Sequence, residues 1–208
     1  YEIPLCDWSS DVCSSDLILT QCGIGKVSAA VGASELIRRF SPDCIVSTGV
    51  AGGIDACLKV TDVVASQRLV YHDVWCGDGN EYGQVQGFPA SYEGCSSLLK
   101  HALSLNEAGM ESRIHSGLVC TGDQFITNRT ELDTIKQRFP DGLAVDMESA
   151  AIAQTCYLYN VPFLSFRIIS DTPGVEDHAS QYADFWGTMA ERSFLTIWTF
   201  LSTLPSNL

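Results

Sequence analysis

Basic residues are scarce in this sequence. It contains 12 lysines and arginines against 25 aspartates and glutamates, which gives a formal net charge of -13 at pH 7. Proteins that bind a phosphate backbone usually carry a basic patch, so this balance argues against a nucleic-acid partner. Solubility alone accounts for the acidic surface, and we prefer that interpretation.

Long apolar runs are also missing. No stretch approaches the length of a membrane span, and no charged-then-apolar signal segment opens the sequence. The nine cysteines form no Cys-x-x-Cys pair and are not matched to paired histidines, so a zinc site is not expected. Several, such as Cys44 and Cys120, stand in apolar runs, where a thiol behaves as a small buried hydrophobe. Reduced thiols of this kind suit a cytoplasmic protein.

The first 16 residues differ from the rest of the sequence. The stretch 7–16 contains Ser-Ser-Asp twice and shows neither a helical nor a strand period. We therefore interpret residues 1–16 as a non-native or disordered N-terminal segment and leave them out of the fold prediction. Residues 17–208 have a length that suits a single α/β domain with one core.

After residue 17, apolar strand patterns alternate with helical patterns. The periodicity predicts strands at 44–48, 62–70, 114–120, 143–145 and 161–170, and helices at 26–40, 96–108, 130–139, 146–159 and 180–204. Strands that are apolar on both faces and alternate with helices are typical of a largely parallel sheet covered on both sides. The sequence therefore predicts the α/β class.

Four segments place polar or glycine residues at the ends of predicted strands: 49–53, 121–126, 146–148 and 170–171. Ligands of open α/β sheets bind beyond the carboxyl ends of the strands, so these segments are candidates for one site. The glycines of 49–53 let backbone approach a ligand closely, although a tight strand-to-helix turn explains each glycine equally well.

Two carboxylates stand out among these segments. Asp171 ends the apolar strand 163–170, where a half-buried carboxyl group can act as a proton donor, and an Asx turn is the alternative. Glu148 has apolar neighbours and can accept two sugar hydroxyls in bidentate fashion. We interpret Asp146 as a cap of the following helix.

Two further motifs carry less information. Residues 23–26, Gly-Ile-Gly-Lys, lack both the Walker A spacing and the dinucleotide fingerprint, so no nucleoside triphosphate or NAD is implied. His72 and Asp73 are adjacent, but no serine or cysteine stands in a recognisable nucleophile motif. A structural histidine at a strand end is therefore preferred to a catalytic dyad.

Together, these motifs resemble one known family. They occur in the order seen in the methylthioadenosine/adenosylhomocysteine nucleosidases of the nucleoside phosphorylase superfamily, at 23–27, 47–53, 71–73, 81–84, 121–126, 145–148 and 169–171. The resemblance implies a three-layer αβα fold with a central mixed, largely parallel sheet, usually as a homodimer. It further implies hydrolysis of the adenine N-glycosidic bond of 5′-methylthioadenosine or S-adenosylhomocysteine, with no metal or cofactor.

The resemblance also implies catalytic roles by position. Asp171 would protonate adenine N7 as the base leaves, and Ser170 would help to position Asp171. Glu148, beside Met147, would hold the 2′ and 3′ hydroxyls of the ribose. A departing purine anion is poor, and the sugar passes through an oxocarbenium-like state that a carboxylate stabilises, so these residue types suit the reaction.

Further residues of the resemblance would contact the substrate. Phe125 would stack on adenine, while the backbone of Ile126 reads the edge of the base. Ala51 and Gly52 would line the sugar. Tyr182 would form the aromatic wall around the 5′-alkylthio group.

The sequence departs from the family pattern in two places. The family carries a glutamate that activates the attacking water on a first strand, which should precede residue 17, and Glu2 does not sit in that motif. If these 208 residues are the whole molecule, we therefore expect the sheet to lack its first strand and hydrolysis to be severely impaired. Val50 stands where a serine is common, and we expect only a modest change in sugar contacts.

Other functions stay open from the sequence. Nucleoside phosphorylases place an arginine two residues before the position of Gly49 and a hydroxyl residue at position 50; here Ser47 and Val50 remove that phosphate grip. A futalosine-type hydrolase and a catalytically silent nucleoside-binding protein are further alternatives. The loop 73–89 carries Trp75, Tyr82 and Phe88, which makes it a candidate dimer contact.

Overall fold

The computed structural model describes residues 6–7, 17–109, 112–173 and 178–205 of the chain. The expectation for residues 1–16 therefore lies outside the described residues, except for strand β1 (Cys6–Asp7), which pairs antiparallel with β2 (Ile18–Leu19). No helix within the described ranges is long and apolar enough to cross a membrane.

The remaining elements alternate between helix and strand from residue 96 to residue 184. The strands are β3 (Ile45–Gly53), β4 (Val63–Tyr71), β5 (Tyr92–Glu93), β6 (Ile114–Thr121), β7 (Gly142–Asp146) and β8 (Phe163–Asp171). The helices are α1 (Lys26–Phe40), α2 (Ser96–Ser104), α3 (Arg129–Arg138), α4 (Ser149–Tyr159), α5 (His178–Asp184) and α6 (Ala190–Ser202). A 3₁₀ turn, η1 (Leu105–Ala108), follows α2, and a π-helical segment, η2 (Phe185–Met189), joins α5 to α6.

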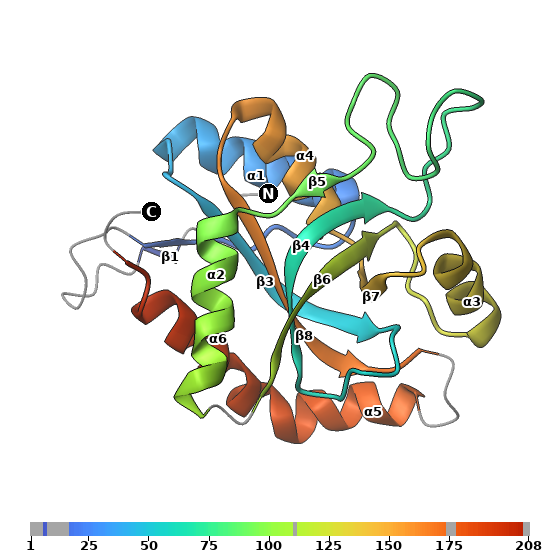
Figure 1. Cartoon of the computed structure of the whole chain (residues 1–208). Helices are drawn as coiled ribbons and strands as arrows, with labels where there is room; N and C mark the ends of the chain where they lie inside the picture. The colour runs from blue at the N-terminus through green and yellow to red at the C-terminus, as the bar shows by residue number, and fades with distance from the viewer. Residues whose placement is uncertain (1–5, 8–16, 110–111, 174–177, 206–208) are drawn as a thin grey trace.

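The six strands form one mixed sheet in the order β5-β4-β6-β7-β3-β8. The pairs β3–β8, β4–β6 and β6–β7 are parallel, and the pairs β3–β7, β4–β5 and β4–β8 are antiparallel. Because β8 also pairs with β4, five of the strands close on themselves. In the described part of the chain, no strand of this sheet comes from before Ile45. Helices α1 and α4 lie against one side of the sheet, and α2 and α6 lie on the other (Figure 1). The predicted α/β fold with a mixed sheet and flanking helices is confirmed.

The glycine-rich stretch 49–53 lies inside β3, so the strand predicted to end at residue 48 continues to Gly53, and the alternative of a strand-to-helix turn does not hold. β3 runs parallel to β8 as far as Ala51, shifts register there, and then pairs antiparallel with β7 through Gly52 and Gly53. A Cβ at Gly52 would lie 2.8 Å from Cγ of Pro173. Gly52 pairs with both β7 and β8, and the close neighbours on this stretch leave little room for a side chain.

Two helical predictions were wrong in their bounds, whereas α1 has the bounds that its periodicity predicts. Helix α4 begins at Ser149 and not at Asp146, because Glu148 is its N-cap residue and the carboxylate of Asp146 accepts the backbone N–H of Ser149 from outside the helix. The pattern predicted as one helix over 180–204 is divided by η2, whose wider turn shifts the faces of the two flanking helices.

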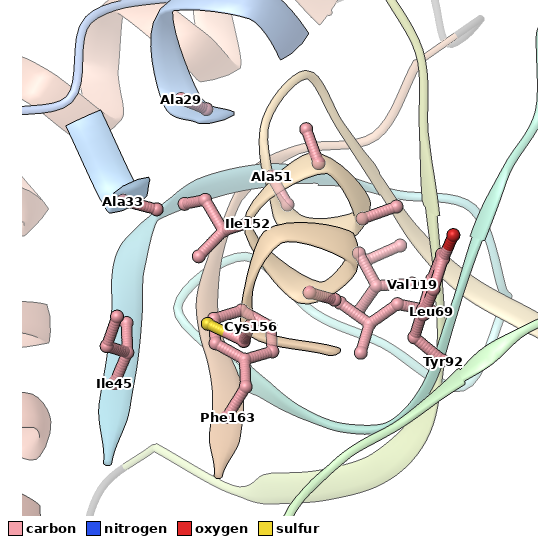
Figure 2. Close-up of a cluster of buried hydrophobic side chains, with 14 of the residues drawn as sticks. Ala29, Ala33, Ile45, Ala51, Leu69, Tyr92, Val119, Ile152, Cys156 and Phe163 are labelled. Atoms are coloured by element: carbon pink, nitrogen blue, oxygen red, sulfur yellow. The ribbon is translucent and has the colours of Figure 1, made fainter. Parts of the chain in front are cut away.

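Separate apolar cores fill the two sides of the sheet. On one side, Ala29 and Ala33 of α1 and Ile152 and Cys156 of α4 pack against strand residues such as Phe163 (Figure 2). The small alanines let α1 approach α4 and the sheet closely. On the other side, α2 and α6 bury apolar residues that include Leu98, Phe166, Ile168 and Phe200.

We expect Phe200→Ala to destabilise the protein by about 3–5 kcal/mol, because it leaves a cavity in a packed core. Phe200 is fully buried, and its ring stacks on that of Phe166 with centroids 4.9 Å apart. Urea unfolding measures the change. Trp198→Ala on the same helix is the control, since Trp198 is 58% exposed and its loss should cost only about 0.5 kcal/mol. Equal losses in the two variants would contradict the burial of this face.

Candidate active site

A cavity of about 740 Å³ opens where segments from distant parts of the sequence meet. Its walls come from residues 19–24, 48–52, 124–126, 145–148 and 170–171, together with Arg167, Pro173, Tyr182 and Trp186. These include the ends of β7 and β8 and the segment that follows β6. The cavity thus lies at the sheet edge where strand ends were expected to gather.

The structure brings all the predicted site residues together. Each of them lines this cavity: Ala51, Gly52, Phe125, Ile126, Met147, Glu148, Ser170, Asp171 and Tyr182. Val50, the position that departs from the family pattern, lines it as well.

Asp171 is held at the end of the most deeply buried strand. All nine residues of β8 are buried, and Asp171 itself is 3% exposed. The hydroxyl of Ser170 donates a hydrogen bond to Oδ1 of Asp171 at 2.5 Å, and Oγ also lies 3.4 Å from the carbonyl oxygen of Ala51. The carboxyl group therefore has a fixed place in the wall of the cavity.

Glu148 is the N-cap residue of α4 and is oriented from across the cavity. Its Oε1 accepts the backbone N–H of Gly25 at 3.0 Å, although the two residues are 123 positions apart. Oε2 lies 3.8 Å from a terminal nitrogen of Arg167. Burial raises the pKa of Glu148 above its ordinary value of 4.5, and the Gly25 hydrogen bond and Arg167 oppose that rise only in part.

Arg167 is a site residue that the sequence analysis missed. Its side chain is 5% exposed, and its Nε lies 2.8 Å from Oδ2 of Asp146. The guanidinium also donates to Ser149 Oγ at 3.0 Å and to Ser47 Oγ at 3.1 Å. The signal in the sequence was a single charged residue inside the apolar strand 163–170.

Asp146 accepts an N–H at the start of α4, as predicted, and it also has several other buried partners. Its side chain is 1% exposed and lies at the centre of a buried network. Besides Arg167 and the start of α4, it accepts the hydroxyl of Thr121 at 2.5 Å and the hydroxyl of Ser149. The network ties β6, β7, β8 and α4 together behind the cavity.

Aromatic rings form one wall of the cavity. The ring of Phe125 meets Tyr182 edge to face with centroids 5.7 Å apart, and Tyr182 meets Trp186 in the same way at 6.2 Å. Trp186 was not predicted as a site residue. It enters the wall from the π-helical segment η2, and a π-helix has no simple signature in the sequence.

His72 and Asp73 do not form a catalytic dyad in the structure. The ring of His72 is buried beneath Gly122, where an added Cβ would lie 2.4 Å from ring atoms. Burial lowers the pKa of His72, and its Nε2 has no hydrogen-bond partner in the part of the chain described. Asp73 turns to Lys26, at 2.8 Å. The preference for a structural histidine agrees with this packing.

The expected position of the water-activating glutamate, before residue 17, lies outside the described residues. Within the ranges that the structure describes, no group of three or more His, Cys, Asp or Glu side chains is placed to hold a metal ion.

The fold and the cavity define a class of protein. The family model of the phosphorylase superfamily matches residues 14–202. Similar proteins narrow the class. A 5′-methylthioadenosine/S-adenosylhomocysteine nucleosidase of Chromohalobacter salexigens is 44% identical over 166 residues, which are 79% of this chain and 71% of that protein. One of Listeria monocytogenes is 41% identical over 93% of this chain and 84% of its own length.

Solved structures give the same result. The nucleosidase of Neisseria meningitidis, in complex with methylthio-immucillin-A, has a TM-score of 0.88 at 31% identity and covers 98% of this chain and 90% of its own. The nucleosidase of Colwellia psychrerythraea, in complex with adenine, has a TM-score of 0.88 at 33% identity, with coverages of 100% and 89%. The chain therefore belongs to the 5′-methylthioadenosine/S-adenosylhomocysteine nucleosidase family.

We expect Arg167→Met to destabilise the protein by about 3–5 kcal/mol, because it leaves the carboxylate of Asp146 buried without its cation. Chemical denaturation measures this change. Arg129→Met is the matched control: Arg129 also pairs through Nε with an aspartate, Asp133, at 2.9 Å, but both side chains are exposed. Its loss should cost about 0.5 kcal/mol or less. A comparable loss of unfolding free energy in both variants would show that the buried Arg167–Asp146 pair stabilises the protein no more than an exposed pair.

Proposed function

We propose that the chain hydrolyses the N-glycosidic bond of 5′-methylthioadenosine, S-adenosylhomocysteine or both, releasing adenine and the 5-thio-substituted ribose. The observation that carries the proposal is that Asp171 and Glu148 line one cavity. One carboxyl group can thus reach the leaving base while the other reaches the sugar of the same nucleoside.

The two carboxyl groups divide the work. Asp171, fixed by Ser170, gives a proton to N7 of adenine, so the base leaves as a neutral molecule when the bond between C1′ and N9 breaks. Glu148 accepts hydrogen bonds from the 2′ and 3′ hydroxyls and stabilises the oxocarbenium-like sugar. Water then adds a hydroxyl group at C1′. In the family pattern, a glutamate on a strand before residue 17 takes the proton from this water, and Glu2 does not sit in that motif.

The other cavity residues position the substrate. Phe125 stacks on adenine, and the backbone of Ile126 reads the edge of the base. Ala51 and Gly52 lie along the sugar, where the bend of β3 brings backbone close. Met147 lies beside Glu148. Tyr182 faces the apolar 5′-substituent, and its edge contact with Phe125 joins the two aromatic subsites.

The charges in the cavity favour water over phosphate as the second substrate. Among the described residues that line it, Arg167 is the only lysine or arginine. Its guanidinium is already directed to Asp146, to Glu148 and to the hydroxyls of Ser47 and Ser149. A phosphate dianion would have to compete with two carboxylates for this one cation, which makes the phosphorylase alternative unfavourable.

We expect the purified protein to release free adenine from 5′-methylthioadenosine in phosphate-free buffer. Asp171→Asn should lower kcat about a hundred- to ten-thousandfold, because the amide cannot supply the proton. A chromatographic assay for adenine, run with and without phosphate, measures both results.

The folded state of Asp171→Asn is checked by its circular dichroism spectrum. Strict dependence on phosphate would assign the phosphorylase reaction to this site. Binding of the nucleoside without release of adenine would assign a silent binding protein. Cleavage of futalosine in preference to methylthioadenosine would assign a futalosine-type hydrolase.

We also propose that the chain is a cytoplasmic homodimer that contacts its partner through the loop 73–89. Trp75 in this loop is 54% exposed and stacks on Tyr82 with centroids 5.9 Å apart. Phe88, from the same loop, meets the exposed ring of Tyr157 on α4. Rings exposed together on one surface favour a protein contact. The cysteines of the described residues from position 22 to position 156 are free thiols, in keeping with a reducing compartment.

Sedimentation equilibrium should give twice the mass of one 22.6 kDa chain. Trp75→Asp should weaken the dimer at least about tenfold, since it places a charge in an apolar contact. Trp198→Asp is the control, because Trp198 is similarly exposed, at 58%, but lies on α6. A monomeric wild type, or equal effects of the two variants, would exclude this interface.

A further inference from the structure

An ion-pair cluster lies outside the cavity lining and takes no part in the proposed chemistry. The ammonium group of Lys26 lies 2.9 Å and 2.8 Å from the two carboxylate oxygens of Asp73. The same ammonium lies 3.6 Å from the carboxylate of Asp123. Asp73 and Asp123 are themselves joined, because Asp73 accepts the backbone N–H of Asp123 at 2.9 Å.

The cluster connects two segments that wall the cavity. Residues 23 and 24 line it just before Gly25 and Lys26, and residues 124–126 line it immediately after Asp123. The backbone N–H of Lys26 donates to the carboxylate of Asp123 at 2.8 Å. The backbone of Lys26 is thus bonded to the second segment, and its ammonium group is bonded to Asp73, which in turn binds Asp123. Sequence separation between the two segments is about a hundred residues, and nothing local holds them together.

The adjoining residue carries the connection to the proposed active site. Gly25 precedes helix α1 with a φ of 88°, a conformation that side chains disfavour, and its N–H points to Glu148. The two successive N–H groups of Gly25 and Lys26 thus bind two different carboxylates. The positive end of the 15-residue helix α1 adds to the attraction for both.

The cluster is sheltered enough to be rigid. The side chains of Lys26 and Asp73 are 23% and 19% exposed, and the ammonium lies 5.4 Å from the ring centroid of Tyr71. Burial raises the pKa of Asp73, but the hydrogen bonds from Lys26 and from the Asp123 N–H outweigh burial and lower it overall. Asp73 is therefore ionised at neutral pH.

We propose that Lys26 is a positioning residue: its contacts with Asp73 and Asp123 clamp segment 23–26 against segment 121–126 and so hold Glu148 in place for the sugar. The inference rests on the proposed hydrolysis for its kinetic consequences. The clamp itself is a contact between segments 23–26 and 121–126, and this contact does not depend on which reaction the site catalyses.

Lys26→Met tests the clamp, because methionine keeps much of the length of the side chain and removes its charge. Lys136→Met is the matched control. Lys136 pairs with Asp55 at 2.9 Å and has a similar exposure of 26%, but neither residue lines the cavity. Lys26→Met loses the contacts with Asp73 and Asp123, and Lys136→Met loses the contact with Asp55 and two hydrogen bonds to backbone carbonyls. Each variant thus loses several contacts of one partly buried ammonium group, so a purely structural cost should be similar in the two.

We expect Lys26→Met to lower kcat/KM for methylthioadenosine about a hundredfold, because a misplaced binding group impairs the reacting geometry. Most of the loss should appear as a higher KM, since the sugar grip acts before and during bond cleavage. As the pH is lowered, kcat/KM of Lys26→Met should also begin to fall at a higher pH than that of the wild type. The reason is that Glu148 loses the Gly25 hydrogen bond, which opposes the rise of its pKa. Lys26→Arg should restore most of the activity by pairing with Asp73.

Hydrogen exchange of the same variants gives a readout that needs no turnover. Lys26→Met should speed exchange in peptides covering 23–26 and 121–126, and Lys136→Met should leave these peptides unchanged. If the wild type releases no adenine, the proposed hydrolysis fails and exchange alone decides the clamp. If Lys26→Met matches Lys136→Met in exchange there, and in kcat/KM where turnover is measured, the clamp is excluded.

Discussion

The guanidinium of Arg167, buried in strand β8, is the group around which the cavity is arranged. A charge taken out of water costs several kcal/mol unless partners replace the solvent, and here Asp146, Ser149 and Ser47 supply them. These partners come from β7, α4 and β3, so one side chain fixes the relative positions of three elements. The backbone of β3 approaches so closely that a Cβ at Gly49 would lie 2.5 Å from the guanidinium.

Much of the fold could be predicted because strand and helix periods are local. Helix α1 and the strands around Ile114 and Phe163 follow directly from runs of apolar residues with clear punctuation. The predicted bounds of strands and helices were wrong where a contact with another part of the structure, and not the local period, determines where an element begins or ends. Residues 49–53 continue a strand because β7 and β8 are there to pair with them, and their glycines gave no sign of it. The start of α4 was moved by the side chain of Asp146, which bonds Ser149.

The site could be predicted to the extent that its residues stand in recognisable motifs at strand ends. Asp171 and Glu148 were found in this way, and the cavity contains both. Arg167 was not found, since a single arginine in an apolar strand says nothing about which carboxylate it meets. Trp186, a lining residue, and Lys26, the proposed positioning residue, were missed for related reasons: one depends on a helical irregularity, and the other on a contact with Asp73, 47 residues away.

The cavity has two parts that differ in how well they tolerate substitution: the buried end of β8 with Asp171, and the aromatic wall. The acid stands at the end of a strand with no exposed residue, where nearly any replacement would disturb the core. The aromatic wall, in contrast, is carried by a segment after β6 and by the helices after β8, and Phe125 and Trp186 are half exposed. Surface segments tolerate substitution far better than buried strands. Related proteins can therefore diverge through the aromatic wall alone, while inheriting the carboxyl group of Asp171, the proposed proton donor, unchanged.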